Sequence, residues 1–171
     1  MAQNPDTVVG ILWIDRTNAV IGRAVSWLTL AMVLVTVSIV LLRYVFSIGW
    51  IWIQESLTWM HAAVFMLGAA WTLRCGDHVR VDVFYKQMTP RKQAIVDMAG
   101  SACFLLPLCG FILFESWPYV AQSFTVGETS REGSGLGMIW VLKAVILVAA
   151  TQIALQGLSE FVRAWRRWKT V

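Results

Sequence analysis

The chain has 171 residues, of which 58% are hydrophobic and only 14% charged, and its formal net charge is +4. Its mean hydropathy of +0.65 excludes an ordinary water-soluble domain, in which about a quarter of the residues are charged. Four membrane spans of about 20 residues each would use most of the length and leave no room for a second, soluble domain. We therefore expect residues 1–171 to form a single all-α integral membrane domain with four transmembrane helices.

Four apolar runs follow one another along the chain, and each is long enough, at about 1.5 Å per residue, to cross a hydrocarbon core of about 30 Å. The predicted spans are residues 22–44, 54–74, 95–118 and 136–159. Loops 75–94 and 119–135 separate the last three spans. Thr89 followed by Pro90 is typical of an N-cap and a first helical turn, so the third helix is expected to begin before the membrane. Pro107 is expected to bend it.

The basic residues are distributed unevenly between the two sides of these spans. The N-terminal segment, the middle loop with Arg74, and the C-terminal tail hold 11 of the 14 Lys and Arg residues, whereas the other side holds only Arg43 and Arg131. Because basic residues accumulate on the cytoplasmic side, both termini and loop 75–94 are predicted to be cytoplasmic and loop 119–135 periplasmic. The chain is expected in a bacterial inner membrane, and its positive charge relates to topology and lipid headgroups rather than to nucleic acid.

Few ionisable residues lie within the predicted spans, and such residues are functional candidates because burying them is costly. Lys143, about two turns inside the fourth span, is expected to reach the periplasmic headgroups or to pair with an acid on another helix; a substrate or ion contact is the alternative. His61 and His78 lie at different depths and do not suit a bis-histidine haem. The three cysteines form no CxxC pair. No cofactor, metal site or catalytic residue is expected.

Two helix faces carry a pattern suited to packing between helices. At 100° per residue, one face of the second span gathers small and large apolar residues beside an acid, and small residues allow helices to approach closely. These residues are Glu55, Trp59, Ala62, Met66, Ala69 and Ala70. The fourth span carries a polar stripe of Gln152, Gln156, Ser159 and Glu160, for which we expect interhelical hydrogen bonds. Either face can serve within the chain or against a partner.

Three segments together resemble the small, DctQ-like membrane subunit of TRAP (tripartite ATP-independent periplasmic) transporters. They are Arg43 at the end of the first span, Trp52 and Glu55 at the start of the second, and residues 68–82 (GAAWTLRCGDHVRVD). The resemblance covers all four spans. It implies a scaffold subunit without catalysis. Its partners would be lipids, a large twelve-helix membrane subunit that carries substrate and sodium, and a periplasmic solute-binding protein that delivers an organic acid.

The resemblance also implies roles for individual residues. Arg43 and Glu55 would form a polar pair near the periplasmic face. Arg74, His78 and Asp82 would fix the cytoplasmic turn or contact the partner; alternatively, Arg74 is a positive-inside anchor and Asp82 a local cap. The structural or partner-contact candidates are Arg43, Trp52, Glu55, Trp59, Arg74, His78, Asp82 and Lys143.

Two other functions are compatible with the same residues. One is an accessory or assembly subunit of another membrane complex, such as a photosynthetic or respiratory one, which would use the same packing faces with a different partner. The other is a stand-alone small transporter, which predicts substrate flux from this chain alone and loss of that flux in Lys143→Ala.

Overall fold

The computed structural model describes residues 5–76 and 85–170, and within these ranges the secondary structure is helical with no strand. The elements are α1 (Pro5–Val45), α2 (Ile51–Cys75), α4 (Pro90–Gly100), the π turn η1 (Ser101–Leu105), α5 (Leu106–Val126) and α6 (Ile139–Thr170). Four helical segments are long and apolar enough to cross a membrane: Leu12–Val45, Ile51–Cys75, Pro90–Val126 and Ile139–Thr170. The prediction of an all-α protein with four transmembrane helices is confirmed.

The helices extend beyond the apolar runs that predict them. The first begins at Pro5, far ahead of the predicted span, and α5 continues to Val126, so that much of the predicted loop 119–135 is helical. A polar residue does not end a helix as long as its backbone hydrogen bonds continue. Gly127 does end α5, because its φ of 61° is left-handed and its N–H turns back to the carbonyl of Phe124. The predicted start of the fourth span, by contrast, lies three residues before α6.

The third span is a continuous run of α4, η1 and α5 that contains a local irregularity. As predicted, Thr89 is the N-cap residue and Pro90 lies in the first turn, although the Thr89 hydroxyl accepts no capping hydrogen bond. The N–H of Leu106 bonds to the carbonyl of Ser101, five residues back, immediately before Pro107. Since proline lacks an N–H and crowds the carbonyl four residues earlier, a widened turn here accommodates its ring.

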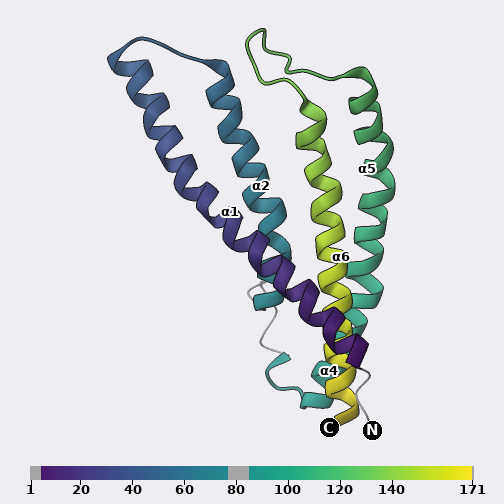
Figure 1. Ribbon diagram of the computed structural model, residues 1–171. Coiled ribbons are helices and arrows are strands. Elements are labelled where there is room, and N and C mark those ends of the chain that lie inside the picture. Colours follow the sequence, from purple (N-terminus) through teal and green to yellow (C-terminus); the bar gives the residue numbers. More distant parts are fainter. Residues whose placement is uncertain (1–4, 77–84, 171) are drawn as a thin grey trace.

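Helix α6 holds the bundle together, because α1, α2, α4 and α5 all pack against it. Figure 1 shows α1 running obliquely across the other helices, with its first half passing α6 and its second half beside α2. The beginning of α1 and the end of α6 lie at the same end of the bundle (Figure 1). Much of the buried surface belongs to α6 and includes Ala149, Ala150, Gln152, Gln156, Gly157, Ser159 and Ala164.

Helices α1 and α2 approach each other closely where Gly22 faces Trp71. A Cβ atom added to Gly22 would lie 1.8 Å from Cε3 and 2.7 Å from Cβ of Trp71. No heavy atom fits at such distances, so the crossing requires a residue without a side chain. The helices thus meet through a glycine and the face of an indole ring.

Candidate functional site

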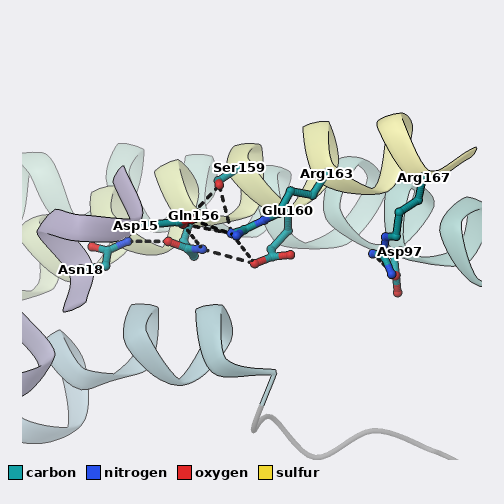
Figure 2. Close-up of polar contacts among 8 residues, drawn as sticks. All are labelled: Asp15, Asn18, Asp97, Gln156, Ser159, Glu160, Arg163 and Arg167. Atoms are coloured by element: carbon teal, nitrogen blue, oxygen red, sulfur yellow. Dashed lines mark hydrogen bonds and ion pairs between the residues drawn. The ribbon is translucent and has the colours of Figure 1, made fainter. Parts of the chain in front are cut away.

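A buried polar cluster joins the first helix to the last. The Asp15 cluster consists of Asp15 and Asn18 on α1 and Gln156, Ser159 and Arg163 on α6 (Figure 2). Asp15, Asn18, Gln156 and Ser159 are all buried, and the last two are fully inaccessible. Burial of so many polar groups is costly unless they bond to one another.

Asp15 accepts most of the hydrogen bonds in this cluster. The guanidinium of Arg163 donates two bonds to its carboxylate, Nη1 at 2.9 Å and Nη2 at 3.0 Å. Nε2 of Gln156 donates to the same carboxylate at 3.1 Å. Asn18 donates through Nδ2 to Oε1 of Gln156 at 2.8 Å, so the amide of Gln156 bridges both α1 residues. The bidentate geometry is the stronger form of an Arg–carboxylate pair.

The polar stripe predicted on the fourth span forms interhelical hydrogen bonds, as expected, and its partner is α1 of the same chain. Gln152 and Ser159 also donate to α1, to Asn18 and Asp15 respectively, at 3.4 Å. Glu160 instead bonds within α6, accepting from Arg163 at 2.8 Å. Sequence reasoning missed Asp15, Asn18 and Arg163. The available signal was that Asp15 and Asn18, three residues apart, share one face of a helix just before the first predicted span.

At the end of the bundle opposite to the Asp15 cluster, Glu55 of α2 binds the loop between α5 and α6. Its carboxylate accepts hydrogen bonds from the hydroxyl of Ser130 and from the backbone N–H of Leu136. The fit is tight around Gly135, where an added Cβ would lie 2.6 Å from Oε2 of Glu55. The structure does not bring Arg43 and Glu55 together as an ion pair: Arg43 lies exposed in the last turn of α1.

Lys143 pairs with Glu128, the residue that follows the glycine ending α5. Its ammonium donates to Oε2 of Glu128, and its Nζ lies 3.9 Å from the centroid of the Tyr119 ring. Ser123 donates to the same carboxylate oxygen at 2.6 Å. The expected partner was an acid on another helix; the acid lies instead at the start of a loop. The hydrogen bond from Lys143, followed by that from Ser123, holds the pKa of Glu128 below its ordinary value.

Replacing Glu128 with glutamine should lower the thermal unfolding temperature at neutral pH, and the loss should disappear in acid. Because the pKa of Glu128 is lowered in the folded protein, its stabilisation is complete above the unfolded value of 4.5 and is lost as the pH falls through the lower, folded value. Unfolding temperatures of wild type and Glu128→Gln across that range test this. Glu132→Gln, in the same loop, is the matched control. An equal deficit at neutral and acid pH would contradict the assignment.

The other residues singled out by the sequence lie apart from these clusters. Trp52 is half-exposed and stacks on Trp50 at a centroid distance of 6.3 Å. Trp59 is half-buried on α2, and Arg74 is exposed in the last turn of that helix. His78 and Asp82 lie outside the described residues. The partner-contact roles of all eight candidates remain predictions.

The polar contacts between described residues fasten helices and loops to one another at the two ends of the bundle. One comparison with known proteins finds a family that matches this chain. The family model described as "Tripartite ATP-independent periplasmic transporters, DctQ component" matches residues 32–167, more than three quarters of the chain. The searches of curated proteins and of solved structures give no match. The match begins within the first membrane helix, spans the second and third, and reaches residue 167 of the fourth. The chain therefore belongs to the DctQ family of TRAP transporter components.

Proposed function

We propose that this chain is the small scaffold subunit of a TRAP-type secondary transporter that imports organic acids across a bacterial inner membrane. It braces a large membrane subunit that carries the substrate, and a periplasmic solute-binding protein delivers that substrate. Both termini and loop 75–94 face the cytoplasm, in agreement with the distribution of basic residues. The observation that carries the proposal is the family match across the membrane helices.

The contacts at the two ends of the bundle support a bracing role. Asp15 ties α1 to α6 at one end, and Glu55 ties α2 to the α5–α6 loop at the other. Lys143 is the basic residue for which a substrate contact was the alternative. It forms an ion pair with Glu128, and only 14% of its side chain is exposed. Charged groups used in this way hold helices in fixed positions. A partner that moves through the membrane needs such a fixed frame, and the chain performs no catalysis in this role.

Gentle detergent extraction of the tagged chain from its native membrane tests the proposal. Mass spectrometry of the purified material should identify a large polytopic subunit of the organic-acid importer type. Recovery of a photosynthetic or respiratory complex instead would mean that the fold serves as an accessory subunit there. Substrate uptake by the chain alone in proteoliposomes, abolished by Lys143→Ala, would contradict the scaffold role and establish a stand-alone transporter.

A further inference from the structure

An open cleft rich in arginine lies at the end of the bundle where α6 terminates. It has a volume of about 720 Å³ and lies between the last turn of α2, the α4–η1 junction and the last turns of α6. Its charged lining residues are Arg74, Arg163, Arg166, Arg167, Asp97 and Glu160. With Asp15, which pairs with Arg163 behind the lining, four guanidinium groups face three carboxylates, so the cleft keeps an excess of positive charge.

The ion pairs inside the cleft leave capacity for an anion. Arg167 bonds to Asp97 at 2.9 Å with 54% of its side chain exposed. Arg74 is exposed and forms no ion pair with a described residue. The Nε–H of Arg163 is buried and finds no acceptor among the residues the structure describes. The guanidinium of Arg74 is therefore suited to a phosphate group, which it can bind through two parallel hydrogen bonds.

An apolar groove continues from this cleft toward the middle of the bundle. The groove has a volume of about 620 Å³ and lies over α6 between α2 and α5, and Leu73 and Leu105 line both cavities. Phe65, Ala69 and Ile112 are among its apolar walls. From Phe65 to Leu73 the groove follows α2 for about 12 Å, at about 1.5 Å per residue. This length approaches half of a hydrocarbon core of about 30 Å.

We propose that the cleft and the groove together bind one membrane phospholipid, with its phosphate among the arginines and an acyl chain in the groove. A free anion would need only the cleft, and a partner helix would need only the groove. A molecule that matches both must be anionic at one end and apolar along about half the membrane. Basic pockets between transmembrane helices bind anionic headgroups by the same chemistry. The bound chain would fill the space between α2 and α5 over α6.

Lipid retention by the full chain, purified in mild detergent with whatever subunits accompany it, tests the proposal. Mixed micelles supply phosphatidylglycerol or phosphatidylethanolamine, and native mass spectrometry counts the lipid retained. Arg74→Gln should weaken phosphatidylglycerol binding about tenfold, the order expected for one charge-assisted hydrogen bond. Arg131→Gln removes the same charge from an exposed site in the α5–α6 loop, at the other end of the bundle, and should leave retention unchanged.

A second pair of variants tests the groove. Ala69→Phe places a ring inside it and should expel the acyl chain, whereas Gly110→Phe adds the same bulk on α5 where a new Cβ meets no atom within 4 Å. Loss of lipid in Ala69→Phe but not in Gly110→Phe supports the proposal. Full retention in both Arg74→Gln and Ala69→Phe would overturn it. Displacement of the lipid by inorganic phosphate, together with an inert Ala69→Phe, would reduce the site to a headgroup-anion site and also contradict it.

Discussion

Asp15→Ala should lower the free energy of unfolding by about 2–3 kcal/mol, because it leaves the guanidinium of Arg163 without its bidentate partner. Breaking a fully buried pair costs about 3–5 kcal/mol, and the lower figure reflects the 33% exposure of the Arg163 side chain. Gln156 and Ser159 would also lose an acceptor inside the cluster. Unfolding by sodium dodecyl sulfate, followed by tryptophan fluorescence in mixed micelles, measures the change.

An exposed ion pair provides the control for this experiment. Arg167 pairs with Asp97 across α6 and α4, and Arg167→Gln should cost at most about 1 kcal/mol because that arginine is 54% exposed. The double variant Asp15→Ala with Arg163→Leu should recover part of the loss, since it removes the guanidinium together with its buried carboxylate partner. The recovery is only partial because Glu160 then loses its ion pair with Arg163. Equal stabilities of Asp15→Ala and Arg167→Gln would show that the Asp15 cluster does not hold α1 in place.

Gly22→Ala should destabilise the bundle by about 2 kcal/mol, within the range found for overpacked cores. The added Cβ would lie 1.8 Å from a ring atom of Trp71 and 2.7 Å from its Cβ, so α1 must move away from α2. The better helix propensity of alanine stabilises the variant by about 1 kcal/mol, and the expected net loss already includes this gain. Gly22→Leu should separate the two helices altogether. The same unfolding titration measures both variants.

Gly68 is the matched control for this crossing. It lies on α2, and a Cβ added there meets no atom within 4 Å. Gly68→Ala should therefore leave stability unchanged or raise it by up to about 1 kcal/mol. If Gly22→Ala behaved like Gly68→Ala, the close approach of α1 and Trp71 would not contribute to stability.

The number and type of helices could be predicted from sequence because a bilayer allows few alternatives. A backbone in hydrocarbon must satisfy its own hydrogen bonds, so each apolar run of sufficient length becomes a helix. The helix ends were less predictable. Charges mark where a chain leaves the hydrocarbon, but α5 continues past Glu115 and stops only at Gly127, whose left-handed backbone ends it.

The polar contacts were only partly accessible, because they depend on how helices lie against one another. The stripe on the fourth span indicated a need for hydrogen-bond partners but could not identify Asp15, which precedes Gln156 by 141 positions. Likewise, the family resemblance implied a polar pair of Arg43 and Glu55, whereas the side chain of Glu55 bonds to Ser130 and the Leu136 backbone. Hydrophobic periodicity specifies which side of a helix is covered and leaves open which residue covers it.

The Asp15 cluster imposes an order on biosynthesis. Arg163 follows Asp15 by 148 positions, so the first helix is translated well before its partner. At about 5–20 residues per second, the ribosome needs about 7–30 s to reach Arg163. During that interval the carboxylate of Asp15 lacks its guanidinium partner. The Asp15 cluster is therefore completed from the C-terminus, and a chain released before its last three turns would leave Asp15 without its bidentate partner.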